Sequence, residues 1–240
     1  MTTAISPGKT RSPLSERLDL IISPIFAAGL AILGFAVWTY SDLDKITIAI
    51  LSPDKIQRQI GETLILGLTS SILVVLIAVP VGILVTRKGY PRLKSALVNT
   101  LGLGQALPAY GLIVIFFSFM GSGIVTVILA LATFSLLPVL RNTIVGLEQV
   151  DKSVIDAARG MGLTARQILL KIELPLSVEV ILGGIRTAVV INIGFSALAF
   201  LVGGGGLGET INSGLKLDRG PAILIGAVMV AIMALLFDFL

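Results

Sequence analysis

The sequence predicts an all-α protein that crosses a membrane about six times. Hydrophobic residues make up 55% of the 240 positions and charged residues only 13%, whereas about a quarter of residues are charged in soluble domains. The mean hydropathy is +1.00. Several apolar runs reach the roughly 20 residues that a spanning helix requires, which is more than a buried helix of a soluble protein needs. These observations place the chain among the polytopic membrane proteins.

Six segments are apolar for long enough to span the bilayer. The predicted spans are Leu20–Tyr40, Thr63–Thr86, Val98–Met120, Ile124–Val145, Leu176–Val202 and Ala222–Leu240. The third is interrupted by the residues GLGQALPAYG, which contain a proline and three glycines. This division predicts a cytoplasmic tail over residues 1–19, a first helix with an outer segment over residues 20–62, and a core over residues 63–240.

Lysine and arginine predict how these spans are oriented, because both residues are enriched in cytoplasmic segments. With the N-terminus inside, eleven of the 18 lie in inner segments and five in outer segments, while Arg141 and Arg186 fall within spans. We therefore expect a multi-pass membrane protein with both termini in the cytoplasm. The last span ends on ALLFDFL without the basic flank that an inner C-terminus normally carries. This is the pattern expected of a truncated copy.

The outer segment DLDKITIAILSPDKIQRQ, residues 42–59, separates the first two spans. Its acidic and basic residues balance. The alternation KITIAIL is compatible with a short surface strand or with an interfacial helix, and the sequence does not decide between them.

The residue types that are missing narrow the classes of function. The chain has neither Cys nor His, which removes disulfides, thiolate metal sites and the commonest general base. An integral-membrane enzyme is weakly supported for this reason, and because the spans hold no paired carboxylates. A secondary transporter driven by an ion gradient is another alternative, but it should carry carboxylates or His near the membrane midplane. The predicted spans contain almost none.

The polar segment DAARGMGLTARQILLKIELP, which ends at Pro175, lies on the predicted inner side. Two helix-capping patterns, S-x-x-D and T-x-x-Q, begin at Ser153 and Thr164. Gly160 and Gly162 can adopt the left-handed geometry that ends a helix, and Pro175 disfavours helix at the residue before it. The segment therefore predicts two short helices joined at a glycine turn. A linker that merely joins two spans is the alternative.

The order of residues in this segment resembles the EAA loop of binding-protein-dependent ABC importer permeases, whose pattern is EAA-x3-G-x9-I-x-LP. The matching residues are Asp156, Ala157, Ala158, Gly162, Ile172, Leu174 and Pro175, and we include Gly160 in the same coupling loop. Aspartate in place of the first glutamate is the one departure, and it shortens the reach of the carboxylate by one methylene. In that family the loop, placed here at residues 147–175, docks into a groove of an ATPase subunit and transmits its closure to the spans.

The resemblance extends from about Thr63 to Leu240 and implies the fold of a type I ABC importer permease. SSILVVLIAVPVGILVTR and ELPLSVEVILGGIRTAVVINIGFSALAFLVGGGGLGETINSGL look most like the branch that imports glycine betaine, choline, carnitine and related osmoprotectants. A permease for methionine or another amino acid is the alternative. The resemblance further implies two cytoplasmic ATPase subunits that bind ATP and Mg, an outer solute-binding protein, and a second permease copy or paralogue. It implies a location in the bacterial plasma (inner) membrane. It implies no enzymatic activity and no cofactor in this chain, and no nucleic acid among its partners.

The glycine run GGGGLGET, from Gly203 to Thr210, fits two nucleotide-binding patterns only superficially. It satisfies G-x-G-x-x-G and aligns with a P-loop, but Glu209 occupies the position where a P-loop requires lysine. No strand is predicted before it, and it lies on the outer side, where no ATP is present. We interpret it as a flexible hinge or a place where helices approach closely, at the mouth that meets the partner delivering the cargo.

A translocation path or gate is assigned to broken, polar and flexible positions in or next to the spans. These are Pro108, Tyr110, Arg186, Asn192, Gly205 and Gly208. Ordinary kinks and packing are the alternatives for the proline and the aromatic residue. Glu179 shares a helical face with Arg186 and either links to it through polar neighbours or lies at the inner interface. For Arg186 a structural role is favoured, because an arginine does not attract a quaternary ammonium cation.

Overall fold

The computed structural model describes residues 13–41, 43–87 and 91–239, and within these residues every regular element is a helix. This confirms the predicted all-α class; residues 1–12 of the predicted tail lie outside the described residues. The α-helices are α1 (Pro13–Tyr40), α2 (Lys45–Ile50), α3 (Pro53–Thr86), α4 (Pro91–Ala106), α5 (Ala109–Met120), α6 (Ile124–Glu148), α7 (Lys152–Gly160), α8 (Ala165–Ile168), α9 (Leu174–Ser196), α10 (Gly208–Lys216) and α11 (Gly220–Phe239). A π-helical turn, η1, spans Leu169–Glu173, and a 3-10 turn, η2, spans Ala199–Val202.

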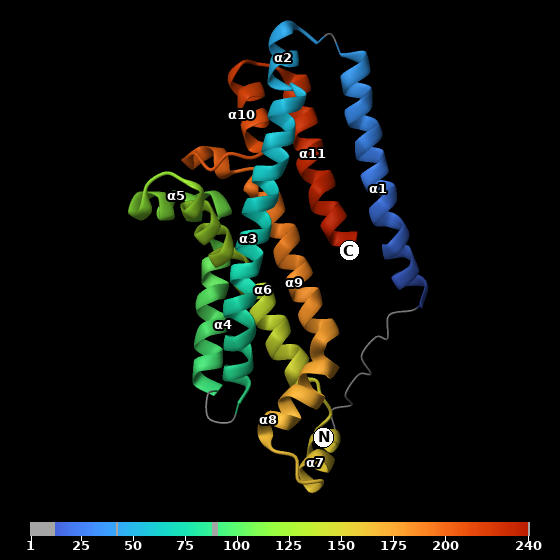
Figure 1. Ribbon diagram of the computed structural model, residues 1–240, viewed down its shortest axis with the longest axis vertical. Helices are drawn as coiled ribbons and strands as arrows, with labels where there is room; N and C mark the ends of the chain where they lie inside the picture. Colours follow the sequence, from blue (N-terminus) through green and yellow to red (C-terminus); the bar gives the residue numbers. More distant parts are fainter. Residues whose placement is uncertain (1–12, 42, 88–90, 240) are drawn as a thin grey trace, which may run out of the picture.

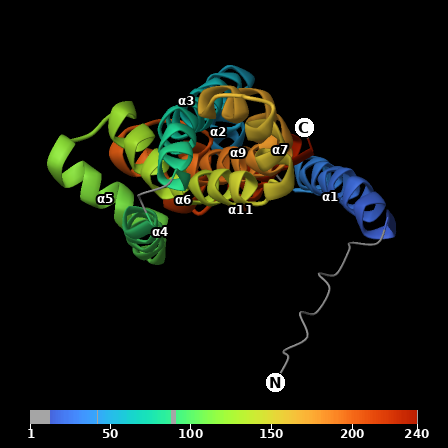
Figure 2. The same cartoon turned by 90° about the horizontal axis from the view of Figure 1, so that it is seen from below.

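The long helices run along one axis and give the bundle two distinct ends (Figure 1). Helices α7 and α8 lie at one end, which we call the α7–α8 end. Helices α2 and α10 lie at the other, the α2–α10 end. Seen along the axis, α1 and the unit formed by α4 and α5 lie on opposite sides of the central helices (Figure 2).

The centre of the bundle is formed by α3, α6 and α9, which approach closely because small residues line their contacts. A β-carbon added at Gly67 of α3 would lie 2.6 Å from Cγ1 of Ile193 in α9. One added at Gly184 of α9 would lie 2.6 Å from the β-carbon of Asn142 in α6. Two buried hydrophobic clusters, one including Val139 and the other Leu66, lie along these contacts. The three helices therefore form the closely packed centre of the molecule.

Four described helices are long and apolar enough to cross a membrane: Pro53–Thr86, Ile124–Glu148, Ala165–Ser196 and Gly220–Phe239. The third predicted span, Val98–Met120, falls on α4 and α5, which meet this test only as a pair and are bent by 99°. The break lies within the interruption, GLGQALPAYG, that the sequence predicted for this span. The bend lies at Pro108, the N-cap of α5, since proline has no backbone N–H to continue the helix. The first predicted span lies on α1, whose described apolar part is Pro24–Tyr40.

The segment between α1 and α3 contains a short helix, α2, and not a strand. Asp44 caps this helix, accepting hydrogen bonds from Thr47 N at 2.9 Å and Thr47 Oγ1 at 2.5 Å. Arg219 Nε donates to the other oxygen of Asp44 at 2.9 Å, which ties α2 to the turn before α11. The hydrogen bonds from Thr47, and then the Arg219 guanidinium, hold the pKa of Asp44 below its usual range. The capping aspartate thus decides between the two sequence interpretations in favour of helix.

Candidate functional site

Helix α7 is capped by Asp151, and not by Ser153 as the sequence pattern predicted. The Asp151 carboxylate accepts a hydrogen bond from Ser153 N at 2.8 Å, so that the helix begins at Lys152. Aspartate caps as well as serine, and Asp151 stands earlier in the chain. The same hydrogen bond holds the pKa of Asp151 below its usual range. Asp156, the expected reciprocal capping residue, instead forms an exposed ion pair with Arg159 at 2.8 Å.

A left-handed turn at Gly162, where φ is +81°, ends α7. Leu163 N donates to Ala158 O at 3.1 Å. Gly162 N donates to Arg159 O at 2.9 Å, and the two bonds together form a Schellman motif. A β-carbon at Gly162 would meet no atom within 4 Å, so the turn faces open space. The predicted left-handed geometry is confirmed for Gly162 and wrong for Gly160, which remains the last residue of α7.

The second capping pattern is confirmed at the start of α8. Gln167 N donates to Thr164 Oγ1 at 3.4 Å, and Thr164 N donates to Gln167 Oε1 at 2.8 Å. The two hydrogen bonds complete a capping box. Ile168, at the end of α8, is buried, so the helix is held against the bundle.

Pro175 does not end the second helix, contrary to the prediction. Helices α8 and α9 are continuous through η1, from Ala165 to Ser196. The π-helical hydrogen bonds of η1 run between residues five apart, and this wider turn gives room to a proline ring that would clash with a carbonyl one turn earlier. The helix that carries the predicted fifth span, Leu176–Val202, therefore begins before that span, and it ends at Ser196, short of η2. Residues 165–175 are therefore continuous with a helix that is long and apolar enough to cross a membrane.

The residues of the EAA-like pattern differ in how much of each is exposed. The exposed members are Asp156, Ala157, Gly160, Gly162 and Pro175, and the partly buried members are Ile172 and Leu174. Ala158 is fully buried. The Gly162 turn is thus presented outward, while Ala158 holds the inner face of α7.

A cavity of about 770 Å³ opens between α7 and the ends of α3 and α6. The charged residues in its wall are Arg87, Glu148, Lys152, Asp156, Arg159 and Glu173. The two signs are equally represented, so the wall does not select ions of one charge. Leu147, Val150 and Ile155 add apolar surface. Such a mixed groove is suited to a protein surface and poorly suited to a small ion.

The sequence reasoning missed an ion pair in this groove. Arg87 Nη1 donates to Glu173 Oε2 at 2.7 Å, although the residues are 86 positions apart. Glu173 is only 8% exposed. The sequence did contain one indication of this ion pair: Glu173 occupies the variable position x of the I-x-LP pattern, where its carboxylate lies among apolar neighbours in the chain.

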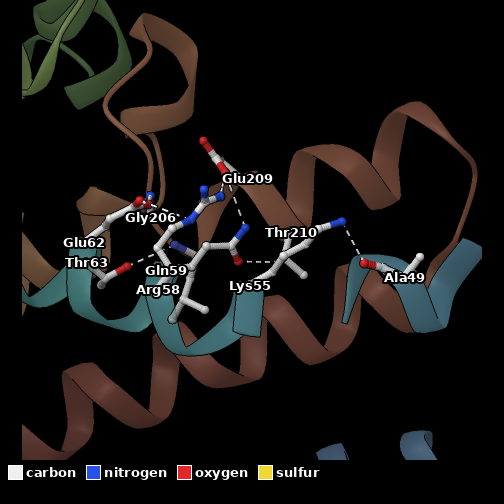
Figure 3. Close-up of polar contacts among 10 residues, drawn as sticks. Ala49, Lys55, Arg58, Gln59, Glu62, Thr63, Gly206, Glu209 and Thr210 are labelled. Atoms are coloured by element: carbon white, nitrogen blue, oxygen red, sulfur yellow. Dashed lines mark hydrogen bonds and ion pairs between the residues drawn. The ribbon is translucent and has the colours of Figure 1, made fainter. Parts of the chain in front are cut away.

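At the α2–α10 end, polar residues of α3 bind the backbone of the glycine loop (Figure 3). Glu62 Oε2 accepts a hydrogen bond from Gly206 N at 2.7 Å. Thr63 Oγ1 accepts one from Leu207 N at 3.0 Å. The side chains of Gln59 and Thr210 are hydrogen-bonded at 2.6 Å, and Arg58 lies 3.5 Å from Glu62 and 3.6 Å from Glu209. We call this set the glycine-loop clamp: Arg58, Gln59, Glu62, Thr63, Gly206, Leu207, Glu209 and Thr210.

The glycine loop itself is tightly packed. Gly203, Gly205 and Gly206 have φ angles of +72°, +77° and +88°. A β-carbon at Gly208 would lie 1.8 Å from Ala197 O, and one at Gly205 would lie 2.5 Å from Glu62 Oε2. Of the two sequence interpretations, close approach is confirmed. At Gly205 and Gly208 the chain has no room for a side chain.

Two residues assigned to the translocation path are held by other helices. Asn192 is fully buried, and its Nδ2 donates to Ser71 Oγ of α3 at 3.0 Å. Arg186 Nε donates to Asp238 Oδ1 of α11 at 3.1 Å. The link between Arg186 and Glu179 that the sequence allowed is therefore not formed, and Glu179 is exposed. Arg186 has the structural partner that was favoured for it.

The remaining path residues lie in two separate places. Pro108 and Tyr110 lie at the bend between α4 and α5, where Tyr110 is 53% exposed. Gly205 and Gly208 belong to the glycine loop. This structure therefore does not gather the six positions into one site. Within the described part of the chain, no group of three or more acidic, Cys or His side chains is placed to hold a metal ion.

Comparison with known proteins gives consistent relatives. Residues 78–240 match the family described as binding-protein-dependent transport system inner membrane component. The chain is 39% identical to a carnitine transport permease protein of Listeria monocytogenes, over 75% of this chain and 82% of that protein. It is 37% identical, over the same shares, to a glycine betaine/carnitine/choline transport system permease protein of Bacillus subtilis. A chain of the inward-facing MetNI methionine ABC transporter has a similar fold, with a TM-score of 0.68 and 25% identity over 82% of this chain and 94% of that one.

Proposed function

Because the chain belongs to the family of inner membrane components of binding-protein-dependent transport systems, we propose that it provides the membrane path of an ATP-driven importer of quaternary ammonium osmoprotectants. As an ABC importer permease it is a non-catalytic subunit, and ATP is hydrolysed by a separate one. The proposed cargo is glycine betaine, choline or carnitine. The relative at 39% identity is named for carnitine, and the relative at 37% identity is named for glycine betaine, carnitine and choline.

The observation that carries the coupling role is the junction between the Gly162 turn and α9. The turn faces open space, and the helix that follows it continues through η1 into a membrane-spanning segment. An ATPase that binds the turn therefore pushes on α9 without an intervening flexible joint. The proposed docking element is residues 147–175, with Asp156, Ala157 and Gly162 at the contact.

Orientation follows from the charges at the α7–α8 end, which we propose is cytoplasmic. Basic residues are enriched on the cytoplasmic side of membrane proteins. Those at this end are Arg87, Arg92, Lys94, Lys152, Arg159, Arg166 and Lys171. Both termini are then cytoplasmic, and the α2–α10 end faces the binding protein.

The proposed assembly is a pair of permeases with two cytoplasmic ATPase subunits and one solute-binding protein. The second permease is another copy of this chain or a paralogue. ATP and Mg are bound by the ATPase subunits. The loaded binding protein docks near the glycine loop, which lies at the α2–α10 end.

The test is to purify the permease with its ATPase, reconstitute the complex in liposomes and measure ATP hydrolysis with binding protein. We expect stimulation when the binding protein carries glycine betaine, choline or carnitine, and none when methionine is supplied. Stimulation by methionine alone would assign the permease to the amino-acid branch. Failure of any ATPase to co-purify would contradict the coupling role.

Topology is tested by labelling single cysteines in this chain, which contains none of its own. Ser213→Cys, in α10, should react with an impermeant maleimide in intact cells. Ser153→Cys, in α7, should react only after permeabilisation. Labelling of the α7 variant in intact cells would overturn both the orientation and the docking of an ATPase at that end.

A further inference from the structure

The ion pair between Arg87 and Glu173 joins the end of α3 to η1. Arg87 is the C-cap residue of α3, and Glu173 is the last residue of η1. Their 2.7 Å contact lies between the Gly162 turn and the start of α9. The pair is therefore located where motion of α7 and α8 enters the bundle.

The guanidinium of Arg87 is fixed to α3 by further hydrogen bonds. Its Nε donates to Ile83 O at 3.2 Å, and its Nη2 donates to Thr86 Oγ1 at 3.2 Å. These contacts use the backbone and side chain of the last turn of α3. A force on Glu173 therefore reaches the helix end and is not absorbed by a flexible arginine.

The carboxylate of Glu173 has little freedom of its own. Its side chain is about nine-tenths buried, and η1 is continuous with α8 on one side and α9 on the other. A displacement of α8 must therefore carry this carboxylate with it. Both residues line the groove between α7 and the ends of α3 and α6, but Glu173 contributes little exposed surface to it. Loss of Arg87 would therefore leave a largely buried carboxylate without its partner, which is unfavourable.

The opposite end of α3 carries the glycine-loop clamp. Helix α3 has 34 residues, which is about 51 Å at a rise of about 1.5 Å per residue. Gln59, Glu62 and Thr63 bind the glycine loop near its first turns. Helix α3 thus has a polar connection at each end, one to η1 and one to the loop at the α2–α10 end.

Building on the proposed function, we propose that the Arg87–Glu173 pair is a strut that transmits displacement of the ATPase-docking turn to α3, and through α3 to the glycine-loop clamp. Arg87 and Glu173 are positioning residues, since they touch neither cargo nor nucleotide. The strut remains closed during the cycle. Without it, α9 moves while α3 stays in place, and the two faces of the membrane lose their connection.

The test uses Arg87→Gln and Glu173→Gln in the complete transporter with its ATPase and binding protein. Both variants should reach the membrane, co-purify with the ATPase and keep its basal hydrolysis rate. Stimulation by binding protein loaded with glycine betaine should fall by about tenfold or more in both variants, because each substitution breaks the ion pair between η1 and α3. The loss should be greater for Arg87→Gln, which leaves the largely buried Glu173 carboxylate without its partner, than for Glu173→Gln, since the Arg87 side chain is 36% exposed. A residue with only a structural role would lower the yield and leave the stimulation of the surviving complex unchanged.

The matched control is Lys94→Gln. Lys94 forms an ion pair with Glu148 at 2.5 Å at the same end of the bundle, and its basic side chain is about as exposed as that of Arg87. The carboxylates differ, because the Glu148 side chain is 48% exposed and the Glu173 side chain only 10%. Exposed pairs contribute little, so stimulation should be that of the native protein. Stimulation equal to that of the native transporter in all three variants would overturn the proposed role of the Arg87–Glu173 pair.

A covalent replacement of the strut gives an independent result. In an Arg87→Cys/Glu173→Cys variant, stimulation should be lost and then restored by a short bifunctional methanethiosulfonate. If the crosslink abolishes stimulation, the pair has to open during transport, and the proposal is wrong. Failure of the glutamine and cysteine variants alike to assemble would assign the pair to folding and also overturn it. Failure of the proposed function itself would be seen in the native transporter, whose ATP hydrolysis would then not be stimulated by loaded binding protein.

Discussion

The two ends of the bundle both place glycines at positive φ, but the surroundings of these glycines are opposite. At the α2–α10 end, Gly205 and Gly206 lie against the side chains of Glu62 and Thr63. At the α7–α8 end, Gly162 has the same backbone geometry and no atom near its β-carbon position. One end is closed by polar contacts and the other presents a free turn.

This difference indicates which property each end controls. A glycine in a packed loop is required by the fold, because any side chain would collide. A glycine in a free turn can be replaced with little effect on the isolated chain, and its requirement comes from a partner. We therefore expect substitutions at the α2–α10 end to change stability and substitutions at the α7–α8 end to change ATPase binding.

The largest effect is expected for Gly208→Ala. The added β-carbon would lie 1.8 Å from Ala197 O, a backbone atom that cannot rotate away. Overpacking commonly costs about 1–3 kcal/mol, and a backbone collision should exceed this range. We expect little folded protein, measured as monodisperse yield in detergent. Gly61→Ala in α3, where no atom lies within 4 Å, is the control and should match the native yield; equal yields for both variants would contradict the comparison.

The next effect is loss of transport in Gly162→Trp. Placing an L-residue in the left-handed region costs about 1–2 kcal/mol, and open space surrounds the new side chain, so the permease should still fold. The indole should prevent the turn from entering an ATPase groove, and uptake should fall to background. Co-purification of the ATPase is the measurement. Lys216→Trp is the control, because Lys216 is exposed at the α2–α10 end, and this variant should keep the ATPase bound. Normal uptake by Gly162→Trp would show that the segment is only a linker between two spans.

The sequence correctly predicted structural features that depend on residues close together in the chain. The apolar runs identified the helices, and the spacing of Thr164 and Gln167 identified a cap that depends on residues three apart. Glycine at 162 was correctly placed at a left-handed turn. Each of these features is determined within one or two helical turns.

Features that depend on distant residues were not predictable in this way. Glu62 and Gly206 are 144 positions apart, and Arg87 and Glu173 are 86 apart. No local pattern specifies which buried acid meets which donor. The sequence also did not predict that the helix continues through Pro175. Proline normally ends a helix, and the π-helical turn that accommodates it here has no simple sequence pattern.

An intermediate effect is expected for Glu62→Ala, which removes the acceptor for Gly206 N in the clamp. Leaving a buried backbone donor without a partner costs about 1–3 kcal/mol. Glu62→Gln keeps an acceptor oxygen and should cost less. Hydrogen exchange of residues 203–210 should accelerate in the alanine variant and much less in the glutamine variant. Unchanged exchange in both would show that packing of the glycines holds the loop without the carboxylate.

The smallest effects concern the two capping aspartates, Asp44 and Asp151, one at each end of the bundle. Hydrogen bonds from Thr47 lower the pKa of Asp44, and those from Ser153 lower the pKa of Asp151. A carboxyl group whose folded pKa is lowered contributes stability that is present above its unfolded pKa and is lost as the pH falls through the folded pKa. Both contributions should therefore be constant from about pH 5 to pH 8 and decline only below about pH 4, near the usual aspartate range.

Substitution by asparagine distinguishes the roles of the two capping residues, because asparagine accepts the same backbone hydrogen bond but carries no charge. Asp151→Asn should leave exchange of the Ser153 amide close to native, since Asp151 serves only as a cap. Asp44→Asn should also preserve the Thr47 hydrogen bond but weaken the contact with Arg219, which lies 2.9 Å from the carboxylate. Faster exchange is then expected in the turn that contains Arg219 while α2 remains protected. Equal responses in the two variants would mean that Asp44, like Asp151, acts within its own helix and does not tie α2 to the turn before α11.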